Sequence, residues 1–338
     1  MWSKLYPLLR QSLFCLPAET SHHLAIDAFA ALGALPFNGG VSKGARAVQL
    51  MGLTFPNRVG LAAGLDKDAR AAEGLAALGF GHVEVGTVTP LPQPGNPQPR
   101  LFRIPPAGAM VNRMGFNSEG LSAMVRRLEG IRSRNRLRDT LLGVNLGKNK
   151  DTPVQEAHRD YVRGLEAVYP YADYVTLNLS SPNTPGLRTL QSPEALRELL
   201  TAVLDARERV GRGRTKPVVV KIAPDLVAED LDAIAAVVST LRIDGIIATN
   251  TTITRPGVDE CWQQEAGGLS GPPLLPLSLA TVRGIRERLG PSVPIIGVGG
   301  ISSSDDARAM FAAGADLVQV YTGFIYRGPI LVHELARV

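Results

Sequence analysis

Cysteine is scarce in this chain, and its scarcity narrows the possible classes of protein. The 338 residues contain only Cys15 and Cys261, with no CxxC motif and no paired spacing. A disulfide framework is therefore not expected, and we expect the chain to work in a reducing compartment. No group of residues has metal-ligand spacing, so no metal site is predicted.

Histidine is also rare. The five histidines are His22, His23, His82, His158 and His333. None of them belongs to a motif at the end of an expected strand, which argues against a Ser-His-Asp hydrolase. Hydroxyl groups and lysines are therefore the remaining candidates for proton transfer.

The first forty residues lack a long uncharged run. No stretch approaches the ~18–20 residues of a membrane-spanning helix. Glu19 and Asp27 interrupt the apolar residues, which also argues against a signal peptide. Leucines at helical spacing instead predict one helix over residues 2–16.

A second helix is predicted over residues 20–35, with Thr20 or Ser21 as its N-cap and Gly39-Gly40 as the following linker. Such a pair of helices can pack on the next domain or lie on a bilayer surface. The residues alone leave both interpretations open.

Positive charge is only slightly in excess, at a formal net charge of +5. This fits anionic small ligands or an anionic membrane surface as well as nucleic acid. One basic cluster contains Arg126, Arg127, Arg132, Arg134, Arg136 and Arg138. It has no interleaved aromatic residues and includes Glu129 and Asp139, so we interpret it as a solvated face and expect no nucleic-acid partner.

Short apolar runs alternate with helical patterns through the rest of the chain. The runs are Val59–Ala62, His82–Val85, Leu142–Leu146, Tyr174–Leu179, Val218–Ile222, Gly245–Ala248, Pro294–Val298 and Leu317–Val320. Eight such units predict an α/β fold, a (β/α)8 TIM barrel with an N-terminal two-helix extension. An open doubly wound sheet is the alternative. A hairpin over residues 48–55 is expected before the first unit.

Polar residues follow these runs, at the end of a barrel where active sites lie. Examples are Asp66-Lys67, Asn145, Asn178, Lys221 and Asn250. A purely structural role would scatter them over both ends. The stretch Asn178–Gly186 is the richest, because its amides and hydroxyls suit a small planar polar ligand, although an ordinary polar turn is the simpler interpretation.

The last two loops contain Gly299-Gly300 and Tyr321-Thr322-Gly323, and they favour a phosphate-bearing cofactor that is not a dinucleotide. Lys67 and Lys221 are expected to face an anion, or to pair with Asp66 or Asp225. Ser181 is the best-placed hydroxyl for proton transfer.

Together these motifs resemble the dihydroorotate dehydrogenase family, in its quinone-linked class 2. The matching stretches, in chain order, are Gly60–Lys67, Gly86–Pro90, Asn112–Phe116, Asn145–Asn149, Asn178–Gly186, Lys221–Asp225, Ala248–Thr252, Gly267–Gly271 and Gln319–Phe324. The resemblance covers almost the whole chain.

The resemblance implies one FMN per chain and oxidation of (S)-dihydroorotate to orotate. It implies Ser181 as catalytic base, where class 1 enzymes carry Cys. The implied substrate-binding residues are Lys67, Asn112, Arg113, Met114, Gly115, Phe116, Asn178, Asn183, Asn250 and Thr251. The implied cofactor-binding residues are Ala63, Gly64, Leu65, Asp66, Lys67, Thr87, Asn145, Asn178, Lys221, Thr249, Gly271, Gly300, Tyr321 and Thr322.

The resemblance also favours the bilayer interpretation of the first helices. It implies a quinone-tunnel segment over residues 1–40, a catalytic barrel over residues 41–338, and a peripheral position on the cytoplasmic face of the bacterial inner membrane. His22, Arg103 and Tyr321 are the implied quinone-site candidates. A soluble class 1 activity, a flavin-free phosphate-ligand barrel and a catalytically silent binding module are the rival interpretations.

Overall fold

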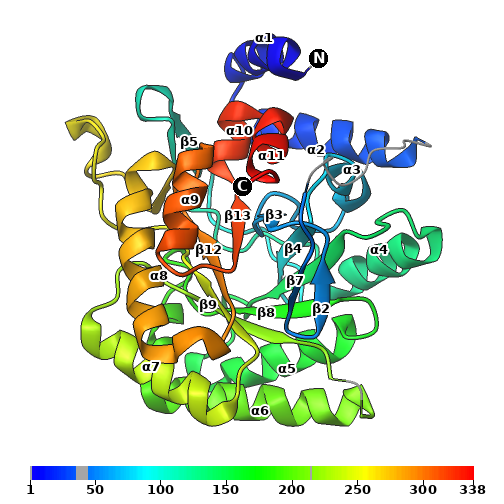
Figure 1. Ribbon diagram of the computed structural model, residues 1–338, viewed down its shortest axis with the longest axis vertical. Helices are drawn as coiled ribbons and strands as arrows, with labels where there is room; N and C mark the ends of the chain where they lie inside the picture. Colours follow the sequence, from blue (N-terminus) through cyan, green and yellow to red (C-terminus); the bar gives the residue numbers. More distant parts are fainter. Residues whose placement is uncertain (1, 36–44, 214) are drawn as a thin grey trace.

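The computed structural model describes residues 2–35, 45–213 and 215–338, and its centre is a closed barrel of parallel strands (Figure 1). The strands are β3 (Val59–Leu61), β4 (His82–Val88), β7 (Leu141–Leu146), β8 (Tyr174–Asn178), β9 (Val218–Ile222), β10 (Gly245–Ala248), β12 (Ile295–Val298) and β13 (Leu317–Val320). The last strand, β13, pairs with β3, so the sheet closes on itself. The barrel prediction is confirmed, and the open sheet is excluded.

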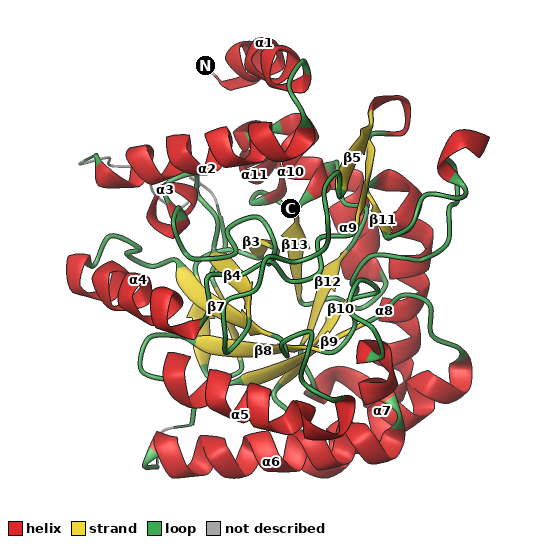
Figure 2. Cartoon of the chain, turned by 180° about the vertical axis from the view of Figure 1, so that it is seen from behind, coloured by secondary structure: helices red, strands yellow, loops and turns green. Residues whose placement is uncertain are grey.

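Helices surround the barrel (Figure 2). They are α3 (Ala72–Ala76), α4 (Leu121–Arg134), α5 (Ala157–Val168), α6 (Pro193–Gly211), α7 (Ala228–Leu241), α8 (Leu275–Leu289), α9 (Ser304–Ala312), α10 (Thr322–Arg327) and α11 (Pro329–Leu335). Their leucines, valines and isoleucines pack on the outward side chains of the strands and form the larger core. The strands are buried on both faces, which explains their near-continuous apolar composition.

The floor of the barrel is closed by the predicted hairpin, β1 (Val48–Leu50) and β2 (Leu53–Phe55). Phe55 is fully buried and packs edge-on against His82, which in turn contacts Tyr174. Burial lowers the pKa of His82 to about 3, so this imidazole is neutral at physiological pH. His82 is therefore a core residue at the end of the barrel opposite the predicted site.

A small antiparallel sheet, not foreseen in the sequence, contributes residues to the barrel mouth. It consists of β5 (Leu101–Ile104), β6 (Ala109–Asn112) and β11 (Gly268–Ser270). Leu269 pairs with Val111, far away in the sequence, and both are fully buried. These strands are three or four residues long, too short to show a period.

The N-terminal extension contains two helices, α1 (Trp2–Phe14) and α2 (Ala18–Ala34). The predicted cap at Thr20 or Ser21 is wrong, because α2 already begins after Pro17, whose φ of −52° suits a helix start. The Ser21 hydroxyl lies inside the helix and donates to the carbonyls of Leu13 (2.6 Å) and Pro17 (3.1 Å). The predicted Gly39-Gly40 linker lies outside the described residues.

Helix α2 is attached to the rest of the protein by apolar packing of Ile26 and Phe29 and by arginines. Arg100 forms a buried, forked ion pair with Glu19, with a shortest distance of 2.6 Å. Arg136 donates to the carbonyls of Gly33 and Ala34 at the end of α2. A Cβ on Gly33 would lie 2.7 Å from the backbone nitrogen of Gly74 in α3, so the glycine permits this close helix contact.

The arginines of the basic cluster are largely engaged within the protein. Arg127 pairs with Glu119, Arg132 with Asp173 and Arg134 with Glu73, while Arg136 binds the end of α2. Their charges therefore hold α2, α3 and α4 to one another and to neighbouring loops.

Helix α1 stands furthest from the barrel (Figures 1 and 2). It is held through Tyr6, which donates to the Ile325 carbonyl, and Arg10, which donates to the Tyr326 carbonyl. Its Leu8 is 66% exposed, and Leu5, Leu9, Leu16, Leu24 and Leu35 are also exposed along the two helices. None of the helices in the described part of the chain is long and apolar enough to cross a bilayer.

Candidate active site

A cavity lies at the carboxyl ends of the barrel strands. It brings together most of the predicted site residues. Those that line it are Ala63, Gly64, Lys67, Thr87, Asn112, Met114, Gly115, Phe116, Asn178, Ser181, Asn183, Lys221, Thr249, Asn250, Thr251, Gly271, Gly300, Tyr321 and Thr322. They come from almost every strand end and from the small sheet.

Four of the predicted site residues do not line the cavity. Leu65 is part of the core, and the buried Asp66 carboxylate accepts the backbone N–H groups of Arg70 and Ala71 (both 2.8 Å). Asn145 is fully buried beneath the cavity floor.

The fourth residue, Arg113, points away from the cavity. Its guanidinium pairs with Glu265, donates to the Pro99 carbonyl and lies 4.7 Å from the ring centroid of Phe102. We therefore expect its side chain to fix the small sheet and the neighbouring loop.

A chain of amide and hydroxyl groups crosses the cavity floor. Asn250 Nδ2 donates to Asn178 Oδ1 (3.2 Å), Asn178 Nδ2 to Thr87 Oγ1 (3.0 Å), and Thr87 Oγ1 to Asn145 Oδ1 (2.5 Å). Asn145 Nδ2 then donates to Glu84 Oε1 (2.8 Å). Each group fixes the orientation of the next, so the chain is pre-organised before any ligand arrives.

Glu84, at the end of this chain, is a functional candidate that sequence reasoning missed. It is fully buried and its other oxygen accepts from Tyr174 (3.1 Å) and Gln319 (3.0 Å). Burial lowers the pKa of Lys221, and the charge of Glu84 opposes that effect. A glutamate between two valines, in a strand expected to be buried, was the available signal.

The Ser181 loop is held by its own asparagine. Ser181 is nearly buried, and its Oγ accepts the backbone N–H of Asn183 (3.3 Å). The Asn183 amide donates to Asn112 Oδ1 (3.2 Å), while the Asn183 carbonyl accepts from Asn96 Nδ2 (3.3 Å). The Thr184 hydroxyl is buried on the same loop and has no protein partner among the described residues.

The carbonyl of Asn96 connects this loop to the N-terminal helices. Arg100, the partner of Glu19, also donates to the Asn96 carbonyl (2.9 Å). Asn96 Nδ2 in turn reaches the Asn183 carbonyl. A continuous set of polar contacts therefore runs from α2 to the Ser181 loop.

The two lysines of the site face the cavity, and neither shows the predicted ion pair. The Asp66 carboxylate is occupied by backbone groups, and Asp225 pairs with Arg188. Burial, with a smaller contribution from the charge of Arg100, lowers the pKa of Lys67 to about 8.

Helix α2 lies close enough to sense this lysine. Burial, helped by the charge of Lys67, lowers the pKa of His22 to about 4. His22 is therefore neutral at physiological pH, and its protonation responds to the charge of Lys67.

Glycines stand close after β12, at Gly299 and Gly300, and close after β13, at Gly323 in the first turn of α10. Gly300 has φ +83°, and a Cβ there would lie 2.5 Å from the backbone nitrogen of Leu275. A Cβ on Gly323 would lie 2.1 Å from the Ile301 carbonyl oxygen. Between these loops, Tyr321 lines the cavity, and burial raises its pKa to about 12. The two glycines therefore allow these segments to pack closely on neighbouring backbone, and Gly299, Gly300 and Gly323 also line the cavity, where backbone N–H groups can approach a ligand.

Sequence and structure comparisons identify the family. The family model described as dihydroorotate dehydrogenase matches residues 46–337. The chain belongs to the dihydroorotate dehydrogenase family. Proteins named dihydroorotate dehydrogenase (quinone) from Burkholderia thailandensis and Paraburkholderia xenovorans are each 52% identical to it. These alignments cover 100% and 99% of this chain and 98% of each relative, which assigns the chain to the quinone-linked class of oxidoreductases.

Solved structures of the family support the same assignment. The dihydroorotate dehydrogenase of Eimeria tenella in complex with ferulenol superposes with a TM-score of 0.88 at 43% identity, covering 94% of this chain and 89% of that one. The ligand-free form gives a TM-score of 0.86 at 43% identity, covering 93% and 92%. The family resemblance seen in the sequence is confirmed.

Proposed function

We propose that this dihydroorotate dehydrogenase family member oxidises (S)-dihydroorotate to orotate in de novo pyrimidine (UMP) biosynthesis and passes the electrons through FMN to a membrane quinone. One observation carries the proposal: a single cavity combines a nearly buried serine, four asparagines and a glycine-rich loop pair. A flavin-free barrel binding a phosphate ligand has no need for the amide chain.

The asparagines suit the proposed substrate. The dihydroorotate ring is planar in part and carries two carbonyls, two ring N–H groups and a carboxylate. Asn112, Asn178, Asn183 and Asn250 each offer a donor and an acceptor, which such a ring requires. Lys67 adds a positive charge for the carboxylate when it is protonated.

We propose that FMN occupies the remaining part of the cavity. The glycines Gly300 and Gly323 line the cavity and suit a phosphate, and the amides around Thr87 and Asn178 suit the polar edge of a flavin. Lys221 lines the cavity with its side chain nearly buried, which suits an anionic reduced cofactor. Bound FMN would supply the hydride acceptor for C6 of the substrate.

Ser181 is the proposed catalytic base, which takes the C5 proton as the C5=C6 double bond forms. The Asn183 N–H at 3.3 Å stabilises negative charge on Ser181 Oγ and so favours proton removal. The Thr184 hydroxyl is the candidate next carrier of the proton, because it lies on the same loop without a partner in the described part of the protein.

The N-terminal helices form the proposed quinone entrance and membrane contact. Their exposed leucines suit the interfacial region of a bilayer and so support a peripheral membrane position. We propose the cytoplasmic face of the bacterial inner membrane for it. Arg103 donates to the carbonyls of Leu13 and Leu16, and so fixes the turn between α1 and α2. Residues 1–40 would then serve the quinone and residues 41–338 the oxidation of dihydroorotate.

The deciding experiment separates the two half-reactions. Purified protein is mixed anaerobically with dihydroorotate while the long-wavelength flavin band is followed, and a soluble quinone analogue is then added. We expect bleaching by the substrate and recovery with quinone. Bleaching without recovery would leave the dehydrogenase and overturn the quinone assignment. Protein that has no flavin band, and gains none on refolding with FMN, would contradict the proposal.

A further inference from the structure

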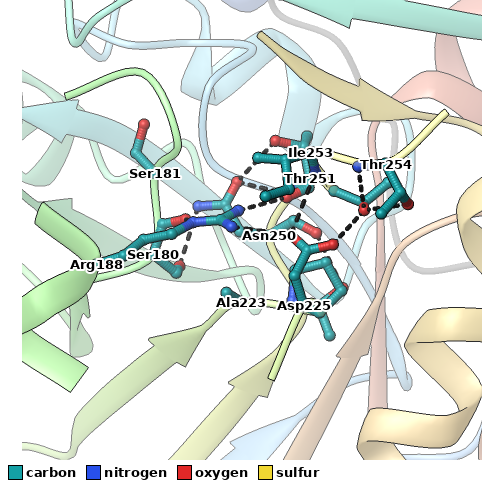
Figure 3. A network of polar contacts seen from close by, with 12 residues as sticks. Ser180, Ser181, Arg188, Ala223, Asp225, Asn250, Thr251, Ile253 and Thr254 are labelled. Carbon is teal, nitrogen blue, oxygen red and sulfur yellow. Dashed lines mark hydrogen bonds and ion pairs between the residues drawn. The ribbon is translucent and has the colours of Figure 1, made fainter. Parts of the chain in front are cut away.

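Arg188 lies outside the cavity lining but contacts three of the loops that form the mouth. It belongs to the short helix η3 (Leu187–Gln191), at the end of the Ser181 loop. Its Nε donates to the Ser180 carbonyl (3.2 Å) and its Nη2 to the Thr251 carbonyl (3.1 Å). Its Nη1 pairs with Asp225 Oδ2 at 2.9 Å, in the loop after β9. Figure 3 shows this side chain reaching from Ser180 toward Asp225 and Thr251.

The two carbonyls that Arg188 binds are adjacent to the proposed reacting groups. The Ser180 carbonyl belongs to the peptide bond that carries Ser181. The Thr251 carbonyl follows Asn250, whose Nδ2 donates to Ser180 Oγ (3.0 Å). The loops after β8 and β10 are therefore joined twice, by Asn250, which lines the cavity, and by Arg188, which does not (Figure 3).

Asp225 fixes the guanidinium in turn. Its carboxylate also accepts the hydroxyl of Thr252 and the backbone N–H of Ile253 (3.2 Å), so it is itself held by the loop after β10. The Asp225 and Arg188 side chains are only 11% and 24% exposed. A planar fork with several fixed donors can satisfy acceptors on separate loops at once, which a lysine cannot.

The next turn of the same short helix is attached to the barrel as well. Gln191 Oε1 accepts the backbone N–H of Ala223 (3.1 Å), just after β9. The Gln191 side chain also donates to the Arg188 carbonyl (3.4 Å). These contacts therefore anchor the Arg188 backbone, which limits the positions that its guanidinium can take.

We propose that Arg188 is a positioning residue for the reaction, which sets the place of Ser181 relative to Asn250 by binding the carbonyls of Ser180 and Thr251. This inference rests on the proposed function, since it assigns Ser181 and Asn250 to dihydroorotate. Loss of these contacts would move Ser181 relative to the ring of bound dihydroorotate. A misplacement of about 1 Å can cost ~10²-fold in rate.

The test compares variants that separate charge from geometry. Arg188→Lys keeps a positive charge for Asp225 but cannot reach both carbonyls. Asp225→Asn keeps the shape but removes the ion pair. Asp244→Asn is the matched control, because Asp244 forms a part-buried pair with Arg207 at 2.7 Å, just before β10 at the opposite end of the barrel.

Anaerobic flavin reduction by dihydroorotate, calorimetric binding of orotate and thermal unfolding are measured for each protein. We expect Arg188→Lys to slow flavin reduction by roughly 10- to 100-fold and to weaken orotate binding, with unchanged flavin content. Dihydroorotate deuterated at C5 should show a larger isotope effect in Arg188→Lys than in the wild type, because proton removal becomes slower. A merely structural contact would leave that isotope effect unchanged.

Two outcomes would overturn the assignment. In the first, Arg188→Lys and Asp225→Asn both keep the wild-type rate of flavin reduction and the wild-type affinity for orotate. In the second, Asp244→Asn loses as much rate as these two variants. If Arg188→Lys fails to fold, Asp225→Asn alone decides. A wild-type flavin that dihydroorotate does not reduce would overturn the proposed function, and the positioning role with it.

Discussion

The two sides of the barrel mouth differ in which part of the chain faces the cavity. After β8 and β10, side-chain amides and hydroxyls such as Asn178, Ser181 and Asn250 line it. After β12 and β13, glycines leave the backbone itself exposed, with Gly300 at φ +83°. The first arrangement can distinguish donors from acceptors on a ring, whereas the second offers N–H groups to an anion of any identity.

This difference predicts which kind of substitution disrupts each side of the mouth. On the amide side, an isosteric change alters one hydrogen bond and leaves the fold intact. On the glycine side, an added Cβ at Gly300 or Gly323 meets backbone atoms, so the loop itself must move. Substitutions should therefore separate the two sides into a chemical defect and a cofactor-retention defect.

The largest effect is expected from Ser181→Ala on the amide side. Flavin reduction should slow by a hundredfold or more, since a general base contributes roughly 10²–10⁴-fold, while FMN stays bound. Stopped-flow absorbance under anaerobic conditions measures the step. Ser192→Ala, at an exposed position after the same loop, is the control. Unchanged reduction in Ser181→Ala would remove the serine from the mechanism.

On the glycine side, Gly300→Ala should release the cofactor. The new Cβ would lie 2.5 Å from the Leu275 backbone, in addition to the cost of a positive φ. Gly290→Ala is a matched control, because Gly290 has φ +61° and a Cβ added there would have no atom within 4 Å. Because Gly290 has φ +61° and ψ −161°, we expect Gly290→Ala to lose about 1–3 kcal/mol of stability from backbone strain alone, without a steric clash. Flavin content after gel filtration compares the two, and equal retention would contradict the phosphate-loop role.

Removal of α1 alone should spare both sides of the mouth and impair the exchange with quinone. Deleting residues 1–16 leaves Glu19 and its ion pair with Arg100 in place. We expect normal reduction by dihydroorotate, but reoxidation by a quinone analogue at least about tenfold slower, the loss expected from roughly 1.4 kcal/mol of quinone binding. Double-mixing stopped-flow measures both steps. Full reoxidation by the shortened protein would show that α1 does not serve the quinone.

The smallest effect near neutral pH is expected for the pH dependence of orotate binding. Lys67 has its pKa lowered to about 8, so in the free protein it is charged below that pH and loses its charge above it. Binding of the orotate carboxylate requires the charge, so the dissociation constant should be flat below pH 8 and rise above it, by up to about tenfold per pH unit. Lys67→Met should bind more weakly and without this dependence. Calorimetric titrations between about pH 6.5 and 9.5 provide the measurement, and a flat wild-type profile would contradict the assignment.

The sequence predicted the barrel because alternating apolar runs and helical patterns are local signals, and each strand differs from its predicted range by no more than three residues at either end. It predicted most cavity-lining residues because they follow the strands directly. It missed the start of α2, where Pro17 replaced a side-chain cap. It also missed the sheet of β5, β6 and β11, whose pairing joins residues far apart in the chain.

The missed site residues share a different cause. Glu84 acts through contacts with three other strands, and Arg188 through carbonyls of residues on separate loops. Neither set of partners leaves a mark in the spacing of residues along the chain. Such roles become visible only when the strand ends are brought together.

The contacts from Glu19 through Arg100 and Asn96 to the Asn183 carbonyl bear on protein engineering. A chimera that exchanges N-terminal helix pairs between relatives would replace Glu19 but keep Arg100, Asn96 and Asn183 of the recipient. If the grafted helix has no acidic residue at position 19, the nearly buried Arg100 guanidinium loses its ion-pair partner. Successful grafts should therefore carry Glu19 with the helices, or exchange the segment around Asn96 and Arg100 at the same time.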